Sequence, residues 1–115
     1  MTDDLDACIS DEVRDRSIPS GSELALLFQD SLQVISCADK RQIAVLGVES
    51  FLARPDGLLV TGYSGYGFSF DGEDWTGFVE INNLHAMKFV EGQVDPEKHH
   101  FILTATSRRE YKSSF

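Results

Sequence analysis

The sequence contains little of what defines several familiar kinds of small protein. Its two cysteines, Cys8 and Cys37, are fewer than a disulfide scaffold of this size normally has, so we expect two reduced thiols, with a single bridge as the alternative. No apolar run approaches the roughly eighteen residues of a membrane-spanning helix. The N-terminal residues M-T-D-D-L-D have neither the basic nor the apolar part of a signal peptide. These absences predict a cytoplasmic protein.

Positive charge is also scarce. Ten Lys and Arg residues stand against 19 Asp and Glu residues, which gives the chain a formal net charge of −9. Proteins that bind a phosphate backbone or an anionic membrane surface use clusters of Lys and Arg. We therefore expect no direct binding to nucleic acid and none to a membrane.

Catalytic motifs are missing from the stretch that comes nearest to them, residues 61–75, T-G-Y-S-G-Y-G-F-S-F-D-G-E-D-W. The nucleophile elbow of hydrolases has the form G-x-S-x-G, and Tyr66 stands where its final glycine would be. A dinucleotide-binding glycine loop opens a helix, whereas the alternating rings that follow here are typical of a strand. We therefore predict that the chain is not an enzyme.

Histidine and cysteine are too few and too scattered for a metal site. His99 and His100 are adjacent, so on a strand they point to opposite faces. Neither has paired spacing with His85 or with a cysteine, whereas zinc needs about three or four convergent ligands. We expect no metal and no other cofactor.

The sequence does contain enough apolar residues for one modest core. Hydrophobic residues make up 42% of the 115 positions and charged residues 25%, close to globular averages. Nine of the 19 acids but only two of the ten bases lie in residues 1–39. We divide the chain into an acidic, partly flexible N-terminal segment (1–20), one α+β domain (21–107) and a basic C-terminal tail (108–115).

Spacings of three and four between apolar residues predict two helices. A short one in residues 1–17 needs to dock on something to be stable. A firmer one is predicted at about residues 22–35, where Ser20 and Glu23 have capping-box spacing and Ser22 is a second candidate N-cap. The buried face of the first helix would contain Leu5, Cys8, Ile9 and Val13, and that of the second would contain Leu24, Leu27, Phe28, Ser31 and Ile35.

From Gln42 onward the pattern is typical of β-strands. Residues 43–53 form an almost continuous apolar run, R54-P-D-G57 is a strong turn, and residues 58–63 return as the second strand of a hairpin. The remaining apolar segments alternate with polar turns that begin at Asp71, Asn82 and Gly92. The second strand continues through residues 66–70 after a bulge or bend near Ser64-Gly65, with the rings of Tyr66, Phe68 and Phe70 toward the core. The further predicted strands are 75–81, 85–90 and 99–106.

Strands joined by short polar turns predict a meander. The predicted fold class is α+β, with one main N-terminal helix packed on a curved antiparallel sheet of about five strands. Such a sheet would be SH3- or Sm-like, or would close into a similar small barrel.

Charge, size and the missing catalytic motifs favour a binding function. We predict a small acidic module of the inhibitor, immunity, anti-defence or adaptor type that docks on the basic surface of a protein partner. Tyr63, Tyr66 and Trp75 would anchor the contact, or the strands from Tyr63 to Trp75 would join two copies in a homodimer. The predicted partner-binding residues are Asp3, Asp4, Asp6, Asp11, Glu12, Asp15, Tyr63, Asp71, Glu73, Asp74 and Trp75.

The alternative is a sensory or structural domain that holds a small ligand in the curved sheet. Its glycine-rich aromatic strands support this second hypothesis. Salt-sensitive capture of a partner, weakened when the N-terminal acids are neutralised, would favour the first hypothesis. A melting shift in a ligand screen would favour the second.

Overall fold

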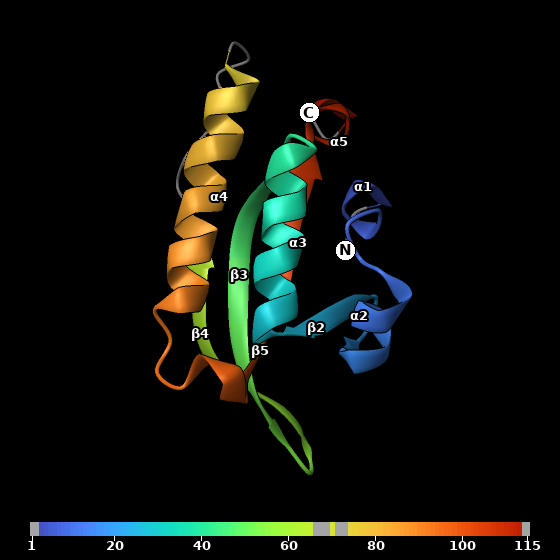
Figure 1. The fold of residues 1–115 in the computed structure, drawn as a ribbon, viewed down its shortest axis with the longest axis vertical. Coiled ribbons are helices and arrows are strands. Elements are labelled where there is room, and N and C mark those ends of the chain that lie inside the picture. Colours follow the sequence, from blue (N-terminus) through green and yellow to red (C-terminus); the bar gives the residue numbers. More distant parts are fainter. Residues whose placement is uncertain (1–2, 66–69, 71–73, 114–115) are drawn as a thin grey trace.

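A curved antiparallel sheet of five strands forms the centre of the structure, and two long helices lie side by side on one of its faces (Figure 1). This computed structural model describes residues 3–65, 70 and 74–113. The predicted α+β class and curved antiparallel sheet are confirmed. The elements are α1 (Asp3–Asp6), α2 (Asp11–Arg16), β1 (Ile18–Ser20), β2 (Glu23–Leu27), α3 (Phe28–Lys40), β3 (Ile43–Arg54), β4 (Gly57–Gly65), α4 (Trp75–Glu91), the 3-10 helix η1 (Pro96–Lys98), β5 (His99–Ser107) and α5 (Arg108–Ser113).

The strands do not follow one another across the sheet. Their order is β1-β2-β5-β3-β4, and each neighbouring pair is antiparallel. Because β5 lies between β2 and β3, the predicted meander is wrong and the SH3- or Sm-like assignment is not confirmed. The main helix is α4, with 17 residues in the middle of the chain, rather than an N-terminal helix.

The helix predicted at residues 22–35 begins later than expected. Strand β2 occupies its first part, and α3 begins at Phe28 without a side-chain cap. Ala25 and Leu26 are both buried although they point to opposite faces of the sheet. Burial on both faces suits a strand between two others, and this pairing with β1 and β5 outweighs the capping-box signal.

Residues 75–91 form one helix, so the strands predicted at 75–81 and 85–90, and the turn between them, are wrong. Asp74 caps the helix because its Oδ1 accepts a hydrogen bond of 2.9 Å from the N–H of Gly77. The buried side chains recur with a helical period, and two of them are asparagines. These buried residues are Trp75, Phe78, Val79, Asn82, Asn83, Ala86 and Val90.

The hairpin around R54-P-D-G57 is confirmed. β3 and β4 pair antiparallel on either side of the turn, and Gly57 has a φ of 130°, which glycine adopts without steric cost. The predicted strand through Tyr66 and Phe68 lies outside the described residues, and Phe70 belongs to no strand. The last predicted strand is confirmed as β5. Its inward residues Phe101, Leu103 and Ala105 are buried as expected.

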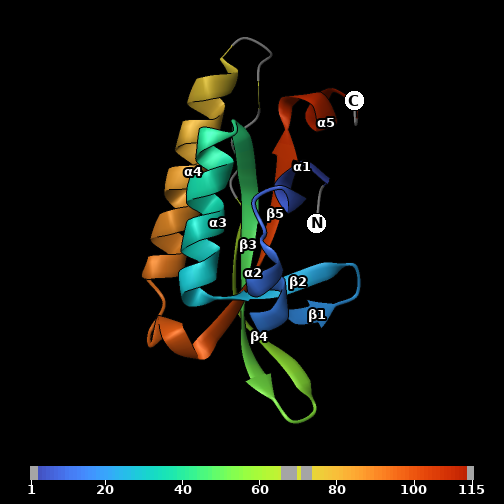
Figure 2. The same ribbon diagram turned by 45° about the vertical axis from the view of Figure 1, so that its right-hand side comes forward.

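The main core lies between the sheet and the helices. Figure 2 shows α1 and α2 beside β5 and β2, in front of the same sheet face that α3 and α4 cover. Leu5, Ile9 and Val13 from this N-terminal segment are buried in the core that contains Val34 and Ile35 of α3. The N-terminal segment therefore contributes apolar side chains to the same core as the long helices.

Cys8 and Cys37 form a disulfide that joins the N-terminal segment to α3, with their Cα atoms 5.7 Å apart. The prediction of two reduced thiols is therefore wrong. Disulfides persist mainly in oxidising compartments, so the expectation of a cytoplasmic location loses the support that it drew from the cysteines. Within the described ranges, no helix combines the length and the apolar character needed to cross a membrane.

Two ion pairs also fasten the N-terminal segment. The Asp4 carboxylate accepts hydrogen bonds from the hydroxyl of Ser107 and from the guanidinium of Arg109, the latter at 2.6 Å. Both bonds lower the pKa of Asp4, and the bond from Ser107 has the larger effect. Arg16, at the end of α2, donates two hydrogen bonds of 3.0 and 2.8 Å to the buried carboxylate of Asp30 in the first turn of α3. These bonds raise the pKa of Arg16.

Candidate functional site

Exposed apolar side chains gather on two elements of the described structure. We call the surface between α3 and α4 the helix groove, and strand β4, residues 57–65, the β4 edge. Large exposed apolar residues mark binding surfaces when they are grouped, whereas single scattered ones are normal on protein surfaces. Those in the described part of the chain are Ile81 and Leu84 on α4, Leu59, Val60 and Tyr63 on β4, and Val94 in the loop after α4.

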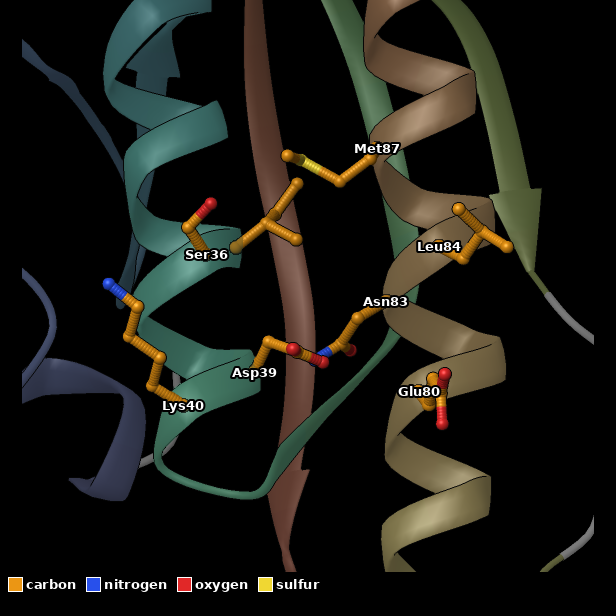
Figure 3. A pocket seen from close by; sticks show the side chains of 8 residues that line it. Ser36, Asp39, Lys40, Glu80, Asn83, Leu84 and Met87 are labelled. Atoms are coloured by element: carbon orange, nitrogen blue, oxygen red, sulfur yellow. The ribbon is translucent and has the colours of Figure 1, made fainter.

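The helix groove has a volume of about 330 Å³, at the lower end of the range for ligand pockets. Its apolar walls are Ile35 of α3 and Leu84 and Met87 of α4. Figure 3 shows the Met87 side chain pointing from α4 toward α3. Leu84 is 52% exposed, so the groove is open to a partner. Its polar residues are Ser36, Asp39, Lys40, Glu80 and Asn83.

Asn83 fixes the floor of the groove. Its Oδ1 accepts a hydrogen bond of 2.7 Å from the N–H of Val45, and its Nδ2 donates to the carbonyl of Ile43 at 3.0 Å. The same Nδ2 donates to Oδ1 of Asp39 at 3.2 Å, and Figure 3 shows these two side chains meeting between the helices. One buried amide therefore joins α4 to the end of α3 and to the start of β3.

Replacement of Asn83 by leucine is expected to lower the free energy of unfolding by about 2–4 kcal/mol, because Val45 and Ile43 would keep buried backbone groups without partners. Urea denaturation measures the change. Asn82→Leu is the matched control. The Asn82 amide donates only to the carbonyl of Phe78 in its own helix, and its Oδ1 has no partner within the described structure. A similar loss in both variants would contradict the assigned role of Asn83.

Charge is uneven around the groove. Asp39 and Glu80 supply two carboxylates, against the single ammonium of Lys40. Figure 3 shows Asp39 meeting Asn83 between the helices and Glu80 on α4 below Asn83, whereas the Lys40 side chain extends along the far side of α3. Apolar walls beside carboxylates suit a segment that carries both apolar and basic side chains.

The β4 edge presents Tyr63, which is 66% exposed. A Cβ added at Gly65 would overlap the Tyr63 ring, and one added at Gly47 would lie 3.4 Å from its hydroxyl oxygen. The two glycines therefore allow the ring to lie close against the backbone of β3 and β4. Tyr63 is thus an exposed side chain whose position is defined by its neighbours.

The predicted N-terminal acids divide into two groups. Asp4 is bound to Ser107 and Arg109 of its own chain, and Asp6 lies 3.5 Å from Arg14 in an ion pair. Asp4 and Asp6, two of the acids predicted to bind another protein, are therefore paired with residues of their own chain. Asp3 lies in α1, and Asp11, Glu12 and Asp15 are exposed on α2.

The residues predicted around the acidic turn do not form one surface with Tyr63. Asp71 and Glu73 lie outside the described residues, and Asp74 is exposed as the N-cap of α4. Trp75 is only 6% exposed, and its indole N–H donates to the carbonyl of Gln42 at 2.7 Å. Trp75 is therefore a core residue and not an exposed anchor.

The strands predicted at 75–81 and 85–90 conceal the helix groove, which needs α4 as one of its two walls. The signal was nevertheless present: Asp74 stands at an N-cap, and apolar residues follow at the helical spacing of Trp75, Phe78 and Val79. With α4 assigned, the side chains of Leu84 and Met87 fall on neighbouring positions of one helix face.

His100 on β5 predicts a pH dependence of stability. Burial lowers the pKa of His100, whose Nδ1 is buried without a partner in the described structure. Between this lowered pKa and about 6.5, the unfolded chain binds more protons, so stability is expected to fall as the pH is lowered from 7. The Asp4 contribution is present above about pH 4 and is lost only below it, in a separate window.

Thermal melting at pH 7 and pH 5.5 tests this expectation. His100→Gln should flatten the slope, whereas His85→Gln, a change on the exposed side of α4, should keep it. An unchanged slope in the His100 variant would assign the effect to another group.

The described residues contain no group of three or more His, Cys, Asp and Glu side chains able to hold a metal ion. What they present is an α+β fold with two grouped apolar surfaces, the helix groove and the β4 edge. No family model, curated protein or solved structure matches the chain.

Proposed function

We propose that this chain is a protein-binding module that holds a short, basic, amphipathic helix of a partner in the helix groove. The observation that carries the proposal is the groove itself, in which Ile35, Leu84 and Met87 form apolar walls beside the carboxylates of Asp39 and Glu80. Helices that bind such grooves insert apolar residues at i, i+3, i+4 and i+7 and keep their charges at the rim.

The charge of the whole chain supports a basic partner. The net charge of −9 produces a long-range field that attracts positive surfaces and raises the rate of encounter. Exposed Asp11, Glu12 and Asp15 on α2 add to this field. The role is binding rather than catalysis, of the inhibitor, immunity, anti-defence or adaptor type, and the disulfide favours an oxidising compartment for it.

Binding of two synthetic helical peptides tests the proposal. Both carry the same apolar stripe, and their polar positions are filled with lysine in one and glutamate in the other. Fluorescence anisotropy should show that the lysine peptide binds and weakens as salt is added, while the glutamate peptide does not bind. Equal binding of the two peptides would contradict a basic partner.

Two matched variants locate the contact. Leu84→Lys should abolish binding, because it places a charge on the apolar wall of the groove. Val94→Lys makes the same change of charge at a side chain that is 82% exposed outside the groove, and it should retain binding. If both variants bind alike, the peptide occupies another surface.

A further inference from the structure

We propose that the β4 edge pairs with the β4 edge of a second copy of the chain, so that two sheets join across a two-fold axis. This surface is separate from the helix groove, and the proposal does not rest on the function assigned to that groove.

The two edges of the sheet differ in how they are protected. The β1 edge has three residues with Pro19 in the middle, and proline cannot donate to a further strand. The β4 edge has nine residues, G-L-L-V-T-G-Y-S-G, with no proline and no charged side chain. Natural sheets normally block such an edge with charges or proline. Of the two edges, β4 is the one that can accept another strand.

A bulge brings the two most exposed of the large apolar side chains of β4 together. Gly62 pairs with Ser50 and Val60 pairs with Phe51, so Thr61 is an extra residue in β4. Tyr63 pairs with Glu49, two residues before Phe51, and residues two apart on a strand share a face. Val60 and Tyr63 therefore lie on the same face. Without the bulge, their odd spacing would separate them.

This shared face points away from α3 and α4. Phe51, the partner of Val60, clusters with Ala25 and Ile102 rather than with the helices. Val60 is 57% exposed, and the glycines beneath Tyr63 leave room for its ring to lie against the sheet. The face therefore offers an exposed valine and an exposed aromatic ring for an apolar contact.

The chemistry of the strand selects a second copy as the occupant. β4 offers no charge to a basic or acidic segment, whereas another β4 is equally neutral and equally long. Antiparallel pairing about the bulge sets Val60 of each copy opposite Tyr63 of the other. Pairs of aromatic and β-branched residues are favourable across antiparallel strands, and here the pair occurs twice.

The electrostatics give the dimer a distinctive salt response. Each copy has a net charge of −9, so the two copies repel each other at low ionic strength, although the strands in contact are neutral. Dimerisation should therefore strengthen as salt is added, which is the opposite of the response expected when a basic partner binds the helix groove.

Sedimentation equilibrium of the intact, oxidised chain at low and high sodium chloride tests the proposal. Because the contact is small, the measurement extends to high protein concentration. The expected result is a dimer whose dissociation constant falls with salt. Val60→Lys should raise that constant at least about tenfold by placing two lysines in the contact, and Val94→Lys should leave it within about twofold.

Hydrogen exchange then identifies the strand. Amides of residues 58–65 should become protected as the protein concentration rises, because pairing gives the outer amides of β4 new acceptors. A chain that stays monomeric at high salt overturns the proposal and leaves the β4 edge to a strand of a different protein. A dimer that Val60→Lys does not weaken, or that leaves these amides unprotected, overturns it as well.

Discussion

Replacement of Cys8 and Cys37 together by serine is expected to lower the free energy of unfolding by about 3–4 kcal/mol. The disulfide closes a loop with a sequence separation of 29, and removing such a link restores conformational freedom to the unfolded chain. The loss is a large part of the stability of a domain of this size. Urea denaturation of the variant and of the wild type, both without reductant, measures it.

Reduced wild-type protein is the control for that experiment. It should unfold at the same urea concentration as the double-serine variant, because both lack the same link. The first change on reduction is expected in α1 and α2, which lose their covalent connection to α3. If reductant leaves the wild-type midpoint unchanged, the two thiols are not paired in solution.

The second large effect is expected from Trp75→Ala, which should cost about 3–5 kcal/mol of stability. The indole ring contacts Phe70, Phe78 and Tyr111 at centroid distances of 4.9, 5.2 and 5.9 Å. Its removal leaves a cavity and deprives the carbonyl of Gln42 of its 2.7 Å hydrogen bond. Thermal and urea unfolding both measure the loss.

Tyr63→Ala is the matched aromatic control. Tyr63 is mostly exposed, so its loss should change stability by less than about 1 kcal/mol. Trp75→Phe should keep most of the packing and lose mainly the hydrogen bond, at about 1 kcal/mol. If Trp75→Ala were as mild as Tyr63→Ala, the indole would not be a core side chain.

Local signals were sufficient for the β3–β4 hairpin and for β5. The turn at R54-P-D-G57 fixes its own backbone geometry, and the flanking runs are apolar over their whole length. The turn and its two strands are determined by residues close to one another in sequence, so they can be predicted without the structure. Residue type alone proposed both Tyr63 and Trp75 as exposed anchors, and only Tyr63 is exposed.

Distant contacts decide the features that sequence analysis missed. β2 is a strand because Leu26 pairs with Phe101 and Ala25 with Ile18, and only the first of these pairings is remote in sequence. α4 contains two buried asparagines that read as a turn, and Asn83 is tolerated in the core because β3 supplies its partners. The helix groove needs both α3 and α4 in place, so an error in α4 conceals it.

The disulfide illustrates the same limit. Cys8 and Cys37 have no spacing that predicts a bridge, and their Cα atoms come within 5.7 Å only because the N-terminal segment packs beside α3. That packing follows from buried Leu5 and Ile9, whose pattern predicted a helix but not where it would dock.

The central position of β5 has a consequence for synthesis on the ribosome. β5 bridges β2 and β3, yet of the five described strands it is the last to leave the exit tunnel. Until it emerges, the β1–β2 hairpin with α3 and the β3–β4 hairpin with α4 are two halves without their common partner. Cotranslational folding can therefore prepare the halves, but closure of the sheet must wait for the final segment, during which nascent chains expose strand edges that chaperones recognise.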